Sequence, residues 1–137
     1  MKEHLRKAQI GKLGEDLASR YLVSIGFLIE RRNYWRPYGE IDVIARKGDK
    51  FHFCEVKTVT CEIGDAPPTL ISQKTDNWSP EENVHPLKLW RLSRVIQTYV
   101  LSLPESADWQ FDVIAVFLDQ ETKKAIVRIT EDVTLGE

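Results

Sequence analysis

Cysteine and histidine are scarce in this chain. Two cysteines, Cys54 and Cys61, and three histidines occur among 137 residues. Two cysteines are too few for the disulfide framework of a small secreted domain, and no Cys or His pair stands at the spacing of a structural zinc site. The composition therefore excludes disulfide-rich scaffolds and argues against a zinc module. We expect Cys54 to be a small buried hydrophobic residue of a strand.

The sequence also lacks long apolar runs. No stretch approaches the roughly 18 residues of a membrane-spanning helix, and the charged start Met1–Lys7 is not followed by the apolar segment of a signal peptide. We therefore expect a cytoplasmic protein with no membrane partner. The apolar content of 42% and the charged content of 29% are those of a globular protein, and the length predicts one domain over residues 1–137.

A strong excess of basic charge is absent as well. The chain carries 19 Lys and Arg against 21 Asp and Glu, which gives a net charge of −2. Proteins that coat nucleic acid usually carry a large basic excess, so this class is disfavoured. Nucleic-acid binding through a local basic face or a bound divalent cation is still compatible with this balance.

Hydrophobic periodicity predicts the element order α-β-β-β-α-β-β. Apolar residues recur at helical spacing in 10–25 and in 87–103. Apolar and alternating runs predict strands at 27–34, 40–46, 51–58, 109–118 and 124–129. The third strand connects to the fourth through a helix, which predicts a mixed sheet flanked by helices. We expect a long irregular connection at 59–86, with a short helical turn at 79–82.

The segment between the second and third predicted strands carries the most informative pattern. Lys47-Gly48-Asp49-Lys50 predicts a two-residue hairpin loop. Asp42 then lies opposite Glu55 and Glu40 opposite Lys57, with all four side chains on one face. Facing like charges destabilise a hairpin, but two carboxylates are also usual ligands of Mg²⁺. A lysine beside them could hold or activate a water.

Two interpretations of this pattern stay open. A Glu-x-Lys triplet on a strand is usually a solvated surface pair, and a bulge would change the register that places Asp42 opposite Glu55. Against this, single acids interrupt the apolar runs 41–45 and 53–56. Charges in strands that look buried on both faces are unfavourable unless they are paired or bind a metal. Such a local conflict is typical of a functional site.

Four segments together resemble a known family. They occur in the same order as in the bacterial YraN family, also named UPF0102, and they are Gly11–Glu15, Tyr38–Ala45, Phe53–Thr58 and Phe111–Val116. That family is similar to archaeal Holliday-junction resolvases and belongs to the PD-(D/E)XK nuclease-like superfamily. The resemblance implies a restriction-endonuclease-like α/β fold, with a central mixed sheet flanked by helices.

The resemblance also implies the members of a catalytic site. Asp42 matches the first carboxylate of the superfamily, and Glu55 and Lys57 match its E-x-K motif. Glu15 matches a helix glutamate that often completes the site in resolvase-like members. Asp42, Glu55 and Glu15 are then the expected ligands of Mg²⁺, for which Mn²⁺ could substitute. Glu15 lies just off the apolar stripe of its helix, so it can equally be an exposed acid.

Basic and aromatic side chains offer a surface for nucleic acid. A phosphate-binding rim is expected from Lys12, Arg36, Lys88 and Arg91, together with Arg31, Arg32 and Arg94. The candidates for stacking on bases are Trp35, Trp78 and Trp90. The alternative is that the basic residues form ordinary solvated faces and that Trp90 packs against the sheet or its loop.

These observations lead to one main functional hypothesis. We expect a Mg²⁺-dependent nuclease that hydrolyses phosphodiester bonds of DNA, with selectivity for branched or damaged DNA. Analogy with resolvases adds a homodimer. The alternatives are a non-catalytic nucleic-acid-binding module and a protein-interaction adaptor that uses the segment 59–86. Two facing carboxylates favour the enzyme, because a module that only binds has no need of them.

Overall fold

The computed structural model describes residues 5–64 and 85–135. Its helices are α1 (Lys7–Ser24) and α3 (Pro86–Val100). Its strands are β1 (Leu28–Arg36), β2 (Gly39–Lys47), β3 (Lys50–Thr60), β4 (Asp108–Asp119) and β5 (Lys124–Thr130). The order α-β-β-β-α-β-β confirms the prediction, and so does the α/β class.

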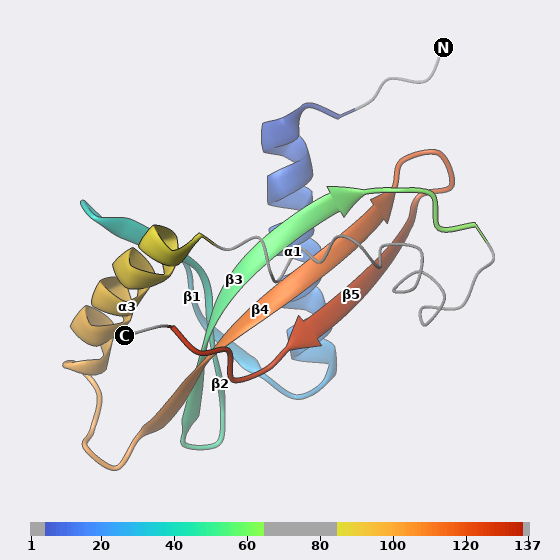
Figure 1. Cartoon of the computed structure of the whole chain (residues 1–137). Coiled ribbons are helices and arrows are strands. Elements are labelled where there is room, and N and C mark those ends of the chain that lie inside the picture. The colour runs from blue at the N-terminus through green and yellow to red at the C-terminus, as the bar shows by residue number, and fades with distance from the viewer. Residues whose placement is uncertain (1–4, 65–84, 136–137) are drawn as a thin grey trace.

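One mixed sheet forms the centre of the molecule, with the strand order β1-β2-β3-β4-β5 (Figure 1). Neighbouring strands are antiparallel except β3 and β4, which run parallel. A parallel pair needs a long crossover, and the crossover between β3 and β4 includes α3. Among the described strands, β1 and β5 are the two outer strands of the sheet and each pairs on one side.

The two helices cover opposite faces of the sheet, because successive side chains of a strand point to opposite sides. Leu22 of α1 packs with Val43 and Cys54 on one face, whereas Ile96 of α3 packs with Phe53 on the other. Figure 1 shows α1 behind the sheet and α3 beside the hairpin of β1 and β2. Cys54 is fully buried, as expected. Neither described helix is long and apolar enough to cross a membrane.

The predicted end of the second helix, at Leu103, is wrong by about one turn. α3 ends at Val100, and the backbone N–H groups of Ser102 and Leu103 donate to the carbonyls three residues before them. These tighter hydrogen bonds close the last turn. The helix therefore stops before Pro104 can end it.

The connection predicted at 59–86 begins later than expected. β3 continues to Thr60 because β4 pairs with it in parallel as far as Leu118. Ile63 is buried beyond the end of the strand, and its N–H donates to Asp119 Oδ2 at 3.1 Å. α3 begins at Pro86. The short turn predicted at 79–82 lies outside the described residues.

The hairpin of β2 and β3 confirms the predicted loop and register. Lys47 pairs with Lys50, and regular pairing continues to Val43 opposite Cys54. Gly48 has a φ of 63°. This left-handed conformation is the one that the first residue of a two-residue hairpin loop needs, and glycine adopts it without strain.

Candidate active site

The candidate active site lies where the backbone pairing of β2 with β3 ends. Past Val43 it is the side chain of Asp42, not the backbone, that accepts the N–H of Val56, at 2.8 Å. Asp42 is also hydrogen-bonded to Glu55, which is only 4% exposed. The structure thus brings together the two carboxylates that the hairpin register predicted.

The predicted pairing of Glu40 with Lys57 is wrong. Glu40 pairs with Trp35 of β1 and is exposed, because β2 leaves β3 at Asp42 and stays with β1. Its side chain lines a hollow together with basic residues of α3. Glu40 therefore does not belong to the carboxylate pair.

Burial and like charge act together on Asp42. Burial raises the pKa of this carboxyl, and the charge of Glu55 raises it further. The hydrogen bond from the Val56 N–H opposes them only in part, and the resulting pKa is about 8. At neutral pH the carboxylate pair therefore retains a proton unless a cation neutralises it. Such a pair is a suitable donor set for Mg²⁺ or Mn²⁺, since oxygen ligands suit both ions and metal binding displaces the proton.

Two lysines from different elements complete the site. Lys57 Nζ lies 3.9 Å from Glu55 Oε1, and Lys88 Nζ of α3 lies 2.5 Å from the same oxygen. Burial, followed by the charge of Lys88, lowers the pKa of Lys57. Burial also acts to lower the pKa of Lys88, but the hydrogen bond to Glu55 and its charge outweigh burial and raise it. Lys88, expected on a phosphate-binding rim, thus contacts a predicted metal ligand directly.

Glu15 comes close to the carboxylate pair but does not join it. Its charge contributes to the raised pKa of Asp42, yet its Oε1 accepts a hydrogen bond from Asn33 Nδ2 at 2.8 Å. Within residues 5–64 and 85–135, the ligand atoms of Glu15, Asp42 and Glu55 do not form a group compact enough to hold one ion. Glu15 would have to turn away from Asn33, or act through a water, to complete a metal shell.

Gly14 sets how closely α1 approaches the site. A Cβ at this position would lie 1.8 Å from Thr58 Oγ1 and 2.8 Å from Thr58 Cβ. Only glycine permits this approach of the helix to β3. Because Glu15 follows Gly14 and Thr58 follows Lys57, the contact fixes the position of Glu15 relative to the E-x-K motif.

Asn33 is a residue of the site that sequence reasoning missed. It lies on β1 opposite Asp42, between two regular pairs of β1 with β2. Its φ of 52° is left-handed, a conformation that asparagine tolerates better than most residues with a side chain. From there its amide holds Glu15. The only signal in the sequence was an asparagine within a strand, where this residue type is uncommon.

Substitutions of Asn33 should separate its backbone role from its side-chain role. Asn33→Ala should be less stable than Asn33→Gly by about 1 kcal/mol, because only glycine adopts the left-handed conformation without strain. Urea denaturation of the two variants measures this difference. Equal stabilities would show that the left-handed backbone at this position is not maintained. Both variants release Glu15, so both should change any metal-dependent property of the site in the same direction.

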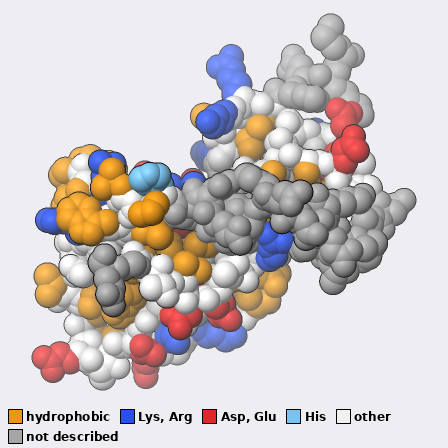
Figure 2. Space-filling view, viewed as in Figure 1, with side chains coloured by type: hydrophobic (Ala, Val, Ile, Leu, Met, Phe, Trp, Pro, Cys, Tyr) orange, Lys and Arg blue, Asp and Glu red, His pale blue; other side chains and the backbone are white. Residues whose placement is uncertain are grey.

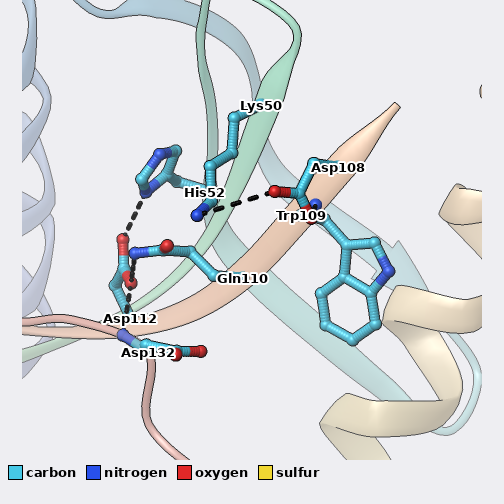
Figure 3. Close-up of polar contacts among 7 residues, drawn as sticks. All are labelled: Lys50, His52, Asp108, Trp109, Gln110, Asp112 and Asp132. Atoms are coloured by element: carbon cyan, nitrogen blue, oxygen red, sulfur yellow. Dashed lines mark hydrogen bonds and ion pairs between the residues drawn. The ribbon is translucent and has the colours of Figure 1, made fainter. Parts of the chain in front are cut away.

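A second polar cluster surrounds Asp112 of β4 (Figure 3). Its Oδ2 lies 2.7 Å from His52 Nδ1, and its Oδ1 accepts hydrogen bonds from Gln110 Nε2 at 2.7 Å and from the Asp132 N–H at 3.0 Å. With Glu131, these His and Asp side chains are the one group in the described part of the chain whose ligand atoms are compact enough for an ion. Protein groups already engage both Asp112 oxygens, however. The cluster therefore ties the C-terminal segment to the sheet.

The other predicted phosphate-binding residues line two hollows. Lys12 lines a hollow beside α1, and Arg36 and Arg91 line another between α3 and the hairpin of β1 and β2. Trp35 borders the hollow between α3 and the hairpin and is 64% exposed. Trp78 lies outside the described residues.

Known proteins match this chain over most of its length. The family model described as "Uncharacterised protein family UPF0102" matches residues 14–116. A UPF0102 protein of Dictyoglomus thermophilum is 33% identical over 120 residues, which cover 87% of this chain and 91% of the relative. A UPF0102 protein of Syntrophus aciditrophicus is 37% identical over 113 residues, covering 81% and 78%, and one of Campylobacter fetus is 33% identical over 112 residues, covering 82% and 87%. The matched segment contains the whole candidate site from Glu15 to Lys88, and the chain belongs to the UPF0102 family.

Proposed function

We propose that this protein is a metal-dependent nuclease that hydrolyses phosphodiester bonds of DNA. The observation that carries the proposal is the carboxylate pair of Asp42 and Glu55, which lies where β2 and β3 diverge. Burial and the like charge of Glu55 raise the pKa of Asp42. Such a pair destabilises the fold when both groups are ionised and no cation is present. A site for a divalent cation explains why the sequence places both acids there.

Each side chain of the site has a role in this proposal. Asp42 and Glu55 would hold Mg²⁺, and Glu15 would complete its shell through a water. When bound, the cation supplies positive charge for the phosphate oxygens and lowers the pKa of a bound water. Lys57, whose pKa burial lowers, would position the attacking water. Lys88 would exchange its ion pair with the Glu55 carboxylate for one with the phosphate of the substrate, because its ammonium can pair with either anion.

One observation favours an alternative, a nucleic-acid-binding module without catalysis. The ammonium of Lys88 already supplies a positive charge to Glu55, at 2.5 Å. If this ion pair persists in the presence of metal, Glu55 is not available as a ligand, and the site is a structural ion pair. The two functions differ in whether DNA is cut and in whether cutting needs the metal.

Cleavage of a panel of labelled DNA tests the proposal. Linear duplex, single-stranded, flapped and four-way DNA are incubated with Mg²⁺, with Mn²⁺ or with EDTA. We expect metal-dependent cutting that Glu55→Gln reduces by a factor on the order of 10³, because a ligand of a catalytic metal contributes several kcal/mol and each 1.36 kcal/mol is tenfold in rate. The preferred shape of DNA would name the substrate class.

Glu105→Gln is the matched control, because Glu105 is exposed and lies in the connection between α3 and β4, outside the helices and strands that carry the site residues. It should cut as the wild type does. Cutting that persists in EDTA, or that is equal in Glu55→Gln, would contradict the proposal. Binding of branched DNA without any cutting would favour the non-catalytic module. DNA as the partner, a homodimer and a cytoplasmic location stay predictions from the sequence.

A further inference from the structure

Three hollows join into one surface across the outer strand β1. The first lies between α3 and the tip of the β1–β2 hairpin and has a volume of about 430 Å³. The second lies between β1 and the C-terminal end of α3 and shares Trp35 and Arg36 with the first. The third lies beside α1 and shares Arg32 and Asn33 with the second. We call this continuous surface the edge track.

The edge track is basic although the whole chain is slightly acidic. Its basic side chains are Lys12, Arg31, Arg32, Arg36, Lys88 and Arg91, and its acidic ones are Glu15 and Glu40. Arg32 is partly neutralised by Asp16, at 2.7 Å. A local basic face of this kind is what a phosphate backbone recognises on an otherwise acidic protein.

Trp35 stands at the middle of the edge track. It belongs to both the first and the second hollow, and it is 64% exposed. The neighbouring Arg36 is held in place, since its guanidinium lies 4.3 Å from the centre of the Tyr34 ring and donates to the Trp35 carbonyl at 2.8 Å. Figure 2 shows hydrophobic and basic side chains interspersed over the end of the molecule formed by α3 and the hairpin.

The hairpin tip is fixed against α3, so the first hollow is already formed. Tyr38 shares a hydrogen bond of 2.6 Å with Thr98, and the Arg94 guanidinium lies 5.5 Å from the centre of the Tyr38 ring. A Cβ on Gly39 would lie 3.1 Å from Val95. The hollow ends at Lys88, whose ammonium contacts Glu55. A chain lying in it would therefore lead to the candidate active site.

We infer that the edge track binds an unpaired strand of nucleic acid, with a base stacked on Trp35 and phosphates at the flanking arginines. Along a duplex each base face is covered by the next base pair, so an exposed indole finds no free face there, whereas an unpaired base offers one. The substrate class is then DNA with a single-stranded arm or flap next to the cutting point, rather than plain duplex. The substrate class rests on the proposed nuclease function. The binding of an unpaired strand does not, because it is measured without cleavage.

Fluorescence anisotropy in EDTA tests the inference. The probes are a labelled single strand of roughly 15 nucleotides, near the upper end of known single-strand site sizes, the blunt duplex of the same sequence, and that duplex with a single-stranded arm. The wild type should bind the single strand and the armed duplex more tightly than the blunt duplex. Trp35→Ala should weaken binding of the two probes with unpaired bases by about 5- to 100-fold, the loss expected for one stacked base.

Two further variants make the result specific. Trp35→Phe keeps an aromatic face and should retain part of the affinity, whereas Leu28→Ala changes another exposed apolar residue of β1, outside the hollows, and should have no effect. Equal binding of blunt and armed duplex, no binding of any probe, or an unchanged affinity in Trp35→Ala would overturn the inference.

Failure of the inference can be told from failure of the proposed function. Strand binding that needs Trp35, without metal-dependent cutting, would leave the edge track standing and reject the nuclease. Cutting of blunt duplex that needs Glu55 but not Trp35 would do the reverse.

Discussion

Replacing Asp42 by Asn should make the metal-free protein markedly more stable at alkaline pH. Burial and the charge of Glu55 raise the pKa of this carboxyl from 3.8 to about 8, so its ionised form is unfavourable in the folded state. Asparagine is neutral at every pH. Its oxygen can still accept the Val56 N–H, and its amide can donate to Glu55. The substitution therefore removes the unfavourable charge and keeps the hydrogen bonds.

The sign of the pH dependence follows from the direction of this shift. Between about pH 4 and about pH 8 the unfolded carboxyl is ionised while the folded one keeps its proton. The unfolded state then binds fewer protons, so the stability of the wild type falls as the pH rises through this range. Asp42→Asn escapes this loss. Its advantage should be small at or below about pH 4 and reach a few kcal/mol, or roughly 10 °C in melting temperature, above about pH 8.

Thermal melting monitored by circular dichroism in EDTA at several pH values measures this effect. Asp49→Asn is the matched control, because Asp49 is an exposed acid in the loop of the same hairpin. It should melt as the wild type does at each pH. A melting temperature of Asp42→Asn below that of the wild type at alkaline pH would show that the ionised carboxylate stabilises the fold.

The same variant reports on the metal. An ion that binds only the folded state must raise the melting temperature. At a concentration 100 times its dissociation constant, it raises the free energy of unfolding by about 2.7 kcal/mol. We expect Mn²⁺ to stabilise the wild type and Asp49→Asn but not Asp42→Asn. If none of the three responds, Lys88 is a sufficient counter-ion for Glu55, and the non-catalytic module gains support.

The second large effect concerns two glycines of α1. Gly14→Ala should destabilise the protein by about 1–3 kcal/mol, the usual effect of overpacking. The new Cβ would meet Thr58 Oγ1 at 1.8 Å and Thr58 Cβ at 2.8 Å. Rotation of the threonine side chain cannot relieve the contact with its own Cβ. The helix must therefore move away from β3 and take Glu15 with it.

Gly11→Ala provides the control for this prediction, since it is the same substitution on the same helix. A Cβ at Gly11 meets nothing within 4 Å, and alanine favours the helix over glycine by up to about 1 kcal/mol. Urea denaturation should therefore shift in opposite directions for the two variants, with unchanged m values. Shifts of the same sign would show that α1 does not lie as close to β3 as the structure has it.

The hairpin could be predicted from the sequence because its determinants are local. The loop residues around Gly48 set the register, and the alternation of side chains then fixed which acids share a face. This was enough to place Asp42 beside Glu55. It failed two residues earlier, at Glu40, because the divergence of β2 from β3 depends on the pairing of β2 with β1.

Residues that reach the site from distant segments could not be predicted. Lys88 contacts Glu55 because α3 packs on the face of the sheet that carries Glu55. Asn33 reaches Glu15 because β1 is the edge strand next to β2. Helical periodicity shows which side of α3 is apolar, but it does not show which strands that side will cover. Long-range packing alone decides such contacts.

One pair of motifs shows this limit most clearly. The sequence Asp-Val-Ile-Ala occurs twice, beginning at Asp42 and at Asp112, each time after an apolar residue in a predicted strand. By itself the sequence determined that both aspartates interrupt buried strands and need partners. Only the tertiary structure decided which partners they have. Asp42 stands where two strands part, beside a second carboxylate, whereas Asp112 lies within paired strands, where His52 and Gln110 satisfy it. The same local sequence thus gives a candidate metal ligand at one place and a structural hydrogen-bond centre at the other, because neighbouring strands, not neighbouring residues, supply the partners.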